Sequence, residues 1–276
     1  MNFNFILTED CNWDCDYCHF PSVKNPRTTT IEILQRHLPY LKDWEITGYM
    51  DVQGGEIGLV PENILEYFLE TMGRKMYFST NGVFLNKKMH LNEKIRPYIK
   101  MIQWHVFPNP NGDAYVENIK DKGIIITRGI VHDDVDEMID FLNNNKHLYI
   151  EYIDFDYSLD SVVTYDRAKY MDLYHKLNHL ENISEGAKNR IRDRAQEKEG
   201  LRMVCKTSND SVLIDLVNEK ICLCQRNMNV NVDLGLLALW NRCKTNPVDY
   251  FLDIDNGNCD SCGRLYEGKT RNLQGI

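Results

Sequence analysis

Over the first two-thirds of the chain, short runs of alternating apolar and polar residues, typical of strands, alternate with helical patterns. The first run places Phe3, Phe5 and Leu7 on one face of an expected strand and Asn4 and Ile6 on the other. Strand and helix patterns then alternate six times, up to about residue 155. Parallel neighbours need crossover connections, so these repeats predict parallel strands with right-handed crossovers. The expected fold class is α/β, with a partial (β/α)6 barrel of TIM type.

Five further strands are expected in this region. They cover residues 49–52, 76–79, 101–107, 124–131 and 148–153. Residues 28–30 can cap a first helix, whereas Pro61 and Gly73 are expected to open and close a second. Further helices are expected at residues 91–99, 113–121, 133–143, 165–179 and 184–198.

The C-terminal part differs in character, because residues 201–276 carry six of the nine cysteines. Residues 212–215 and 220–223 predict a β-hairpin across residues 217–219. We therefore expect two domains. Residues 1–200 would form the barrel with its following helices, and residues 201–276 a small lobe made of a β-hairpin plus a helix.

Charge and hydropathy exclude several functional classes. The chain has 41 acidic and 32 basic residues and no cluster of Lys and Arg, so no nucleic-acid partner is expected. The N-terminus lacks a basic segment followed by a long apolar run, so no signal peptide is expected. Residues 230–240 are the most apolar late segment, far short of the roughly 20 residues of a membrane span. We expect a cytoplasmic protein with no membrane partner.

Cys11, Cys15 and Cys18 form a CxxxCxxC motif directly after the first strand. Loops that follow the strands form the active face of an α/β barrel. Cytoplasmic cysteines favour metal or redox chemistry over disulfides. Three thiolates on one short loop can hold three irons of a [4Fe–4S] cube and leave the fourth iron open. With His19 as a fourth ligand, the same residues could instead hold zinc.

The context of this motif indicates a family. Residues 54–56, Gly-Gly-Glu, follow the second strand, and residues 80–82, Thr-Asn-Gly, follow the third. Together with the cysteine motif and the aromatic Tyr17, they resemble the radical S-adenosylmethionine superfamily over about residues 1–160. The chain departs from the family pattern at Ile57, where a proline often stands.

The resemblance implies a [4Fe–4S] cluster on the cysteine motif whose open iron binds S-adenosylmethionine. One electron, from a reductant such as flavodoxin or ferredoxin, would then yield a 5′-deoxyadenosyl radical that abstracts hydrogen from a substrate. The glycines would let the backbone approach the methionine ammonium, with the glutamate beside it. The residues implied for cofactor binding are Tyr17, Gly54, Gly55, Glu56, Thr80, Asn81, Arg128 and Val131. A surface ion pair is the alternative for Arg128.

The C-terminal cysteines suggest a second cluster. Cys259 and Cys262 have a spacing common among metal ligands. With Cys205 before the hairpin and Cys224 at its end, the order resembles the twitch domain, a shortened SPASM appendage. The resemblance implies that these four cysteines bind one auxiliary [4Fe–4S] cluster, since two fully ligated cubes would need eight. Glu219 stands where this pattern usually has glycine. A zinc ribbon is the alternative.

Glu151, Asp154 and Cys222 are the candidate catalytic residues. The two acids follow or end the sixth strand, where they could bind a cationic substrate or act as a base; solvated loop acids are the alternative. Cys222 is also the alternative ligand to Cys224. His105 is expected to point into the barrel or to be a satisfied core histidine.

A barrel followed by a twitch-like lobe resembles peptide-modifying enzymes and dehydrogenases of small-molecule alcohols. We expect modification of a residue of a ribosomally synthesised peptide by crosslinking, epimerisation or oxidation. The first strand begins at residue 2, so no leader-binding module is expected before the barrel. Dehydrogenation or rearrangement of a small molecule is the second hypothesis, and a non-catalytic metal-binding protein is the third.

Overall fold

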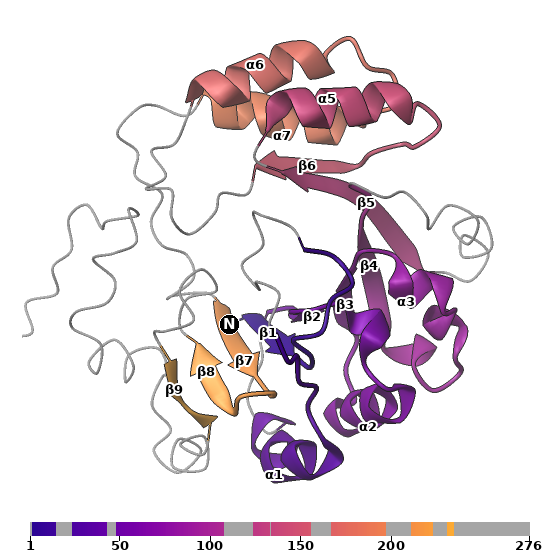
Figure 1. Ribbon diagram of the computed structural model, residues 1–276, viewed down its shortest axis with the longest axis vertical. Coiled ribbons are helices and arrows are strands. Elements are labelled where there is room, and N and C mark those ends of the chain that lie inside the picture. The colour runs from indigo at the N-terminus through magenta and orange to yellow at the C-terminus, as the bar shows by residue number, and fades with distance from the viewer. Residues whose placement is uncertain are drawn as a thin grey trace, which may run out of the picture.

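The computed structural model describes residues 2–14, 24–42, 48–107, 124–132, 134–155, 167–196, 211–222 and 231–234. Their strands are β1 (Asn2–Ile6), β2 (Met50–Gln53), β3 (Met76–Thr80), β4 (Ile99–His105), β5 (Ile125–His132), β6 (Tyr152–Phe155), β7 (Ser211–Asp215), β8 (Lys220–Cys222) and β9 (Asn231–Asp233). They form one nine-stranded sheet in the order β6-β5-β4-β3-β2-β1-β7-β8-β9. Figure 1 shows this sheet as a curved row with helices along its outer side.

The six strands predicted from the βα repeat are confirmed. β1 to β6 pair with one another in chain order, and every pair is parallel. The α/β class with a partial barrel of TIM type is therefore confirmed. β6 begins at Tyr152, somewhat later than the expected residue 148.

The helices are α1 (Ile31–Lys42), α2 (Glu62–Met72), α3 (Val83–Asn86), α5 (Val135–Asn144), α6 (Arg167–Leu177) and α7 (Glu185–Gln196). The expected caps are present: the Ile33 N–H donates to Thr30 Oγ1 at 3.4 Å, and Gly73 ends α2 with φ of 64°. No helix within the described ranges is long and apolar enough to cross a membrane.

The helix expected at residues 91–99 is wrong. That segment holds two short 3₁₀ helices, η2 (Met89–Leu91) and η3 (Arg96–Tyr98), with a turn between them. Pro97 lies inside the expected helix, where it has no N–H to donate and its ring collides with the preceding turn. The helix expected at residues 113–121 lies outside the described residues.

The core lies between the sheet and the outer helices. Leu34 and Leu38 of α1 and Phe68 of α2 are fully buried in one core with Phe5 of β1, and the rings of Phe5 and Phe68 meet edge to face at 5.2 Å. Burying a side chain of this size contributes about 1.5–3 kcal/mol. This layer fixes the helices on the outer side of the sheet, so the inner face is left for polar residues.

The predicted C-terminal hairpin is confirmed, and it joins the barrel sheet. β7 pairs with β1 in parallel, whereas β8 and β9 continue the sheet in antiparallel pairs. Leu216 strengthens the junction, because its N–H donates to the Ile6 carbonyl at 3.0 Å and its carbonyl accepts from the Thr29 hydroxyl at 2.8 Å. The boundary near residue 200 lies outside the described residues, so the two-domain division stays a prediction.

Glu219 turns the hairpin with a left-handed backbone, at φ of 55°. Its side chain reaches α1, where Oε2 lies 2.6 Å from Arg36 Nη1 and 2.7 Å from His37 Nε2. The hydrogen bond to His37 and the charge of Arg36 lower the pKa of Glu219. A residue in a position that favours glycine is thus compensated by contacts that glycine could not make.

Replacing Glu219 with Ala is expected to destabilise the protein more than replacing it with Gly. Both variants lose the contacts with Arg36 and His37, but Ala keeps a left-handed backbone that costs an L-residue about 1–2 kcal/mol. Urea unfolding should therefore show Glu219→Ala to be less stable than Glu219→Gly by about 1 kcal/mol. Equal stabilities would contradict this account. The pKa of Glu219 is lowered in the folded protein. The stability that the wild-type protein gains from the contacts with Arg36 and His37 should therefore be lost as the pH falls through the pKa of Glu219 in the folded state.

Candidate functional site

The ends of β1 and β2 are held together by backbone contacts across two glycines. The Gly55 N–H donates to the Thr8 carbonyl at 2.9 Å, and the Glu56 N–H donates to the Asp10 carbonyl at 2.7 Å. A Cβ on Gly55 would lie 2.2 Å from the Asp10 oxygen, and Gly54 has φ of 120°. Only glycine fits both positions, so these residues bring the end of β2 against the start of the cysteine loop, the segment between β1 and α1.

Glu56 is a buried carboxylate, 2% exposed, that accepts four hydrogen bonds. Its Oε1 accepts from the Gly58 N–H at 2.8 Å, the Thr80 hydroxyl at 2.7 Å and the Phe84 N–H at 3.1 Å. Its Oε2 accepts from the Asn81 N–H at 2.7 Å. Burial raises the pKa of Glu56, and these donors oppose the rise. The side chain therefore ties the end of β2 to the turn that follows β3.

The same turn contacts the first cysteine. Asn81 Nδ2 donates to Asn12 Oδ1 at 2.8 Å and lies 3.7 Å from Cys11 Sγ, which also accepts from the Trp13 N–H at 3.5 Å. Two N–H donors at one sulfur stabilise its thiolate form, which is the form that binds metal. Cys11 thus fits the role of a cluster ligand, and hydrogen bonds to sulfur are among the features that set cluster potentials.

Two further predicted residues, Arg128 and Glu151, lie next to each other. The Arg128 guanidinium of β5 lies 5.8 Å from the centre of the Trp104 ring, and its Nε is buried without a hydrogen-bond partner. The backbone N–H of Arg128 donates to Oε2 of Glu151 at 3.1 Å, and Glu151 is the residue directly before β6. The structure does not bring either side chain into contact with Glu56 or Cys11 through a hydrogen bond between described residues.

The remaining predicted residues lie outside the described part of the structure, either entirely or by their side chains. Val131, Asp154 and Cys222 belong to β5, β6 and β8 by their backbones, but their side chains lie outside the described part. The whole residues outside it are Cys15, Tyr17, Cys18, Cys205, Cys224, Cys259 and Cys262. Within the described part, no three His, Cys, Asp or Glu side chains are grouped as a metal site.

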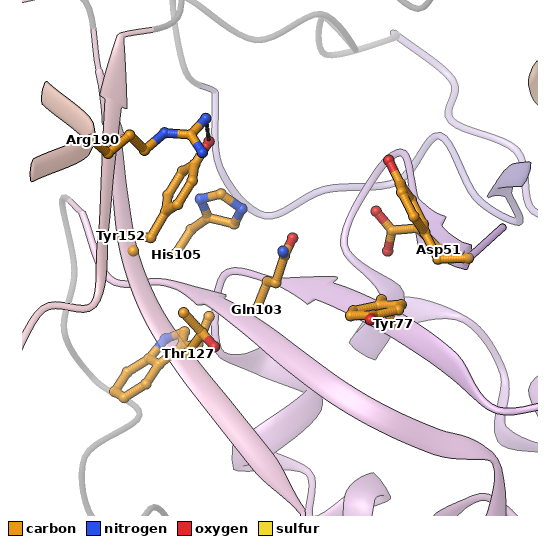
Figure 2. A pocket seen from close by; sticks show the side chains of 10 residues that line it. Asp51, Tyr77, Gln103, His105, Thr127, Tyr152 and Arg190 are labelled. Carbon is orange, nitrogen blue, oxygen red and sulfur yellow. Dashed lines mark hydrogen bonds between the residues drawn. The ribbon is translucent and has the colours of Figure 1, made fainter. Parts of the chain in front are cut away.

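A polar cavity of about 440 Å³ lies among the strands of the barrel sheet (Figure 2). The strand register explains its lining, because alternate residues of neighbouring strands share one face: Gln103 pairs with Thr127, and Asp51 with Tyr77. His105 lines the cavity, which agrees with the first of the two alternatives given for it, a side chain that points into the barrel. The residues that line the cavity are Tyr49, Asp51, Tyr77, Gln103, Trp104, His105, Thr127, Gly129, Tyr152 and Arg190.

Sequence reasoning missed most of this cavity. Arg190 lies in the helix expected at residues 184–198 and is exposed, but its guanidinium also lies over the Tyr152 ring at 4.5 Å. The available signal was the occurrence of Asp51, Gln103 and Thr127 at alternate positions of strongly predicted strands. Polar residues at such positions indicate a filled or functional barrel interior rather than an apolar core.

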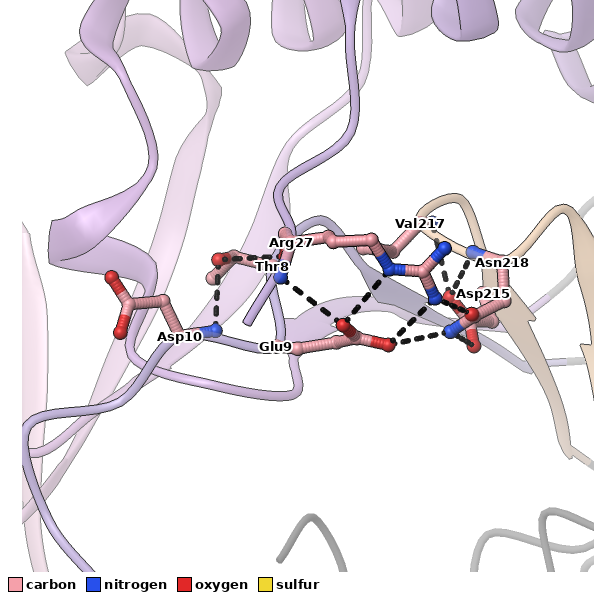
Figure 3. A network of polar contacts seen from close by, with 7 residues as sticks. All are labelled: Thr8, Glu9, Asp10, Arg27, Asp215, Val217 and Asn218. Carbon is pink, nitrogen blue, oxygen red and sulfur yellow. Dashed lines mark hydrogen bonds and ion pairs between the residues drawn. The ribbon is translucent and has the colours of Figure 1, made fainter. Parts of the chain in front are cut away.

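A polar network closes the cysteine loop at its base and joins it to the C-terminal hairpin (Figure 3). The Glu9 N–H donates to the Arg27 carbonyl at 2.8 Å, and the hydroxyls of Thr8 and Thr28 lie 2.8 Å apart. Arg27 forms an ion pair with Glu9 at 3.3 Å and also donates to Asn218 Oδ1. Asn218 Nδ2 in turn donates to Glu9 at 2.8 Å. Both ends of the loop are therefore tied to each other and to the hairpin turn.

Residues 5–107 match a family model described as the radical SAM superfamily. Over this segment the chain is similar to radical SAM superfamily enzymes. The matched segment runs from β1 to just beyond β4 and contains the cysteine motif, the two glycines and Glu56. The cofactors that this similarity implies are a [4Fe–4S] cluster and S-adenosylmethionine.

Solved radical SAM structures share this fold over nearly the whole chain. SuiB of Streptococcus suis, bound to S-adenosylmethionine, is 17% identical with a TM-score of 0.54 over 96% of this chain and 71% of SuiB. AnSMEcpe with bound AdoMet is 13% identical, with a TM-score of 0.56 over 96% of this chain and 88% of its own. BtrN with AdoMet and 2-DOIA is 11% identical, with a TM-score of 0.52 over 92% and 84%. At these identities the likeness shows the fold. A comparison with curated protein sequences finds no significant match.

Replacing Glu56 with Ala is expected to destabilise the protein by about 3 kcal/mol or more. The change leaves the buried N–H groups of Gly58, Asn81 and Phe84 without an acceptor, and each orphaned group costs about 1–3 kcal/mol. Urea unfolding of the anaerobically purified protein measures the effect. Glu70→Gln, on the exposed side of α2, is the matched control and should leave the stability unchanged. A loss below about 1 kcal/mol for Glu56→Ala would contradict the assigned contacts.

Proposed function

We propose that the enzyme binds a [4Fe–4S] cluster through Cys11, Cys15 and Cys18 and modifies a residue of a ribosomally synthesised peptide by crosslinking, epimerisation or oxidation. The cluster and S-adenosylmethionine, when bound, supply a 5′-deoxyadenosyl radical that abstracts hydrogen from the substrate. The observation that carries the proposal is the environment of Cys11, whose sulfur accepts N–H donors from Trp13 and Asn81 at the carboxyl ends of β1 and β3. A packed structural thiol has no need of two such donors.

The residues around this loop are proposed to hold the cofactor. Glu56 Oε2 accepts a single hydrogen bond from the described residues, from the Asn81 N–H, which leaves acceptor capacity for the methionine ammonium. Gly54 and Gly55 offer backbone atoms without side chains beside it. For the ribose, carboxylate and adenine, the proposed contacts are Tyr17, Thr80, Asn81, Arg128 and Val131.

The substrate is proposed to enter the polar cavity of Figure 2. Its volume of about 440 Å³ falls within the range of small-molecule sites, roughly 300–1,000 Å³. One amino-acid side chain of a peptide fits a cavity of this size. SuiB has been solved with its precursor peptide SuiA, and anSMEcpe with the Cp18Cys peptide, each with a TM-score of 0.54 to this chain. These relatives support a peptide substrate.

Dehydrogenation or rearrangement of a small molecule is the second candidate. The likeness to BtrN, crystallised with 2-DOIA and covered over 84% of its length, supports it. In either reaction Glu151 and Asp154, next to or within β6, are proposed as the acids that bind a cationic group or take up a proton. A flavodoxin- or ferredoxin-type protein is the proposed source of electrons.

We further propose an auxiliary [4Fe–4S] cluster bound by Cys205, Cys224, Cys259 and Cys262. The hairpin supports this assignment, because β8 ends at Cys222, two residues before the proposed ligand. The left-handed backbone of Glu219 adds support, since the twitch pattern usually has glycine there. Cys222 is the alternative ligand, and a zinc ribbon is the alternative metal site.

Replacing Cys11, Cys15 and Cys18 with Ala is expected to remove about four of about eight irons and to abolish cleavage of the cofactor, since each cube holds four irons. Iron analysis and mass spectrometry of 5′-deoxyadenosine after dithionite reduction measure both effects. Cys243→Ala, a cysteine outside both proposed ligand sets, is the control and should keep both properties. Cleavage by the triple variant would refute the central assignment.

Replacing Cys259 and Cys262 with Ala is expected to leave 5′-deoxyadenosine formation measurable and to remove one cluster. A cube capped by four cysteines has no open iron for the cofactor, so cleavage does not depend on it. Mössbauer spectra of separate Cys222→Ala and Cys224→Ala variants identify the second ligand, because only the loss of a true ligand removes the second signal. An unchanged spectrum for the Cys259/Cys262 variant would refute the auxiliary cluster.

A further inference from the structure

Asp51 places a carboxyl group without a full set of partners on the wall of the polar cavity. The side chain is only 9% exposed, and its Oδ1 is buried without a hydrogen-bond partner. No Lys, Arg or His of the described ranges forms an ion pair with it. A buried carboxyl group left in this state costs free energy that a bound ligand can recover. Figure 2 shows Asp51 at one side of the cavity, facing Gln103.

Aromatic rings flank this carboxyl group. Tyr49 precedes β2 and Tyr77 is the β3 neighbour of Asp51; their rings meet edge to face at 5.6 Å. Lys100 Nζ lies 4.9 Å from the centre of the Tyr77 ring, so this ring already attracts one cation. The rings, together with a carboxyl group that ionises when a cation binds, favour a positively charged group over an anion.

The positive charge of the cavity lies on its other side. Arg190 of α7 donates to the Tyr152 hydroxyl at 3.1 Å and lies over the same ring at 4.5 Å. Figure 2 shows both residues next to His105 and across the cavity from Asp51. These contacts hold the guanidinium away from the carboxyl group. The cavity thus has an acidic end and a basic end, with the neutral side chains of Gln103 and Thr127 between them.

We propose that Asp51 binds a protonated primary amine of the substrate, whose hydrogen-bond acceptors face Arg190. The single unpartnered oxygen suits the point donation of an ammonium better than the two-pronged fork of a guanidinium. The inference rests on the proposed function, because it specifies the substrate class of the same site. The amine is carried by a lysine residue of a peptide or by an aminated small molecule.

The methionine ammonium of the cofactor does not explain the Asp51 site. Asp51 lies in β2 and stands four residues before Gly55, which corresponds to a separation of at most about 13 Å at roughly 3.3 Å per residue. The glycines and Glu56 lie at the carboxyl end of the strand, next to the cysteine loop. Neither Glu56 nor these glycines are among the residues that line the cavity with Asp51. The cavity extends from Asp51 in β2 to His105 at the carboxyl end of β4, and so reaches the edge of the sheet where the strands end.

The test compares amines with neutral analogues of the same shape. The probes are Nα-acetyl-lysine methylamide against Nα-acetyl-norleucine methylamide, and glucosamine against glucose. Calorimetric titration of the anaerobically reconstituted protein with S-adenosylmethionine bound should show the amine of at least one pair binding about tenfold more tightly or better. Tighter binding of the lysine derivative would indicate a peptide substrate, and tighter binding of glucosamine would indicate a small molecule. Equal affinities within both pairs, as expected if water satisfies Oδ1, would overturn the proposal.

Asp51→Asn tests the residue itself and should abolish this preference, whereas Glu70→Gln on α2 should keep it. Burial raises the pKa of Asp51 to about 8, so an uncharged side chain of the same shape should leave the unfolding temperature at neutral pH unchanged or higher. A preference retained by Asp51→Asn, or a weakened affinity for S-adenosylmethionine instead, would overturn the proposal. Binding is measured without turnover. A protein that prefers amines but forms no 5′-deoxyadenosine would refute the proposed function and leave this inference standing.

Discussion

Four hydrogen bonds to one buried carboxylate determine the arrangement of the site. Glu56 accepts from η1 (Ile57–Leu59), from the end of β3 and from α3, so the ends of two neighbouring strands are fixed to each other. Asn81 is held in this way by its N–H, and its side-chain amide contacts Cys11. The position of the first cysteine therefore depends on an acid that is itself 2% exposed. Losing that acid would leave several buried donors unpaired at once, which is why its effect extends beyond its own strand.

The cysteine loop is held from a second direction by the C-terminal hairpin. Arg27, at the far end of the loop, contacts both Glu9 and Asn218, which also contact each other. In addition, β7 pairs directly with β1. The last described strands therefore support the first strand and the loop that leaves it. A change in the hairpin can alter the loop without touching a cysteine, since the partly buried ion pair and the strand pairing form one connected network. This coupling is a property of the described residues alone and needs no assumption about the rest of the lobe.

Local patterns predicted the local structure well. Apolar periodicity located β1 to β6, and Gly73 ended α2 as expected, because such features depend on a few neighbouring residues. The failure at residues 91–99 also has a local cause, since Pro97 interrupts an otherwise helical pattern. Long-range features were not predictable in the same way. Nothing near β7 indicates that it would lie parallel to β1, and the partners of Glu219 on α1 are about 180 residues away. The missed cavity belongs to this class, because its lining depends on the register of five strands.

The two buried acids of β2 and its following turn show how stability and binding are divided in this barrel. Glu56 has all the donors that its Oε1 can use, and its carboxylate contributes to the fold by holding two loops. Asp51 is similarly buried, but one oxygen has no partner, and burial raises its pKa to about 8. A carboxyl group in that state opposes folding at neutral pH, and an asparagine in its place would remove the part of this cost that comes from ionisation. Its cost to stability is repaid only when a donor occupies the cavity. The distinction between a satisfied and an unsatisfied acid therefore separates the residue that builds the site from the residue that selects what enters it.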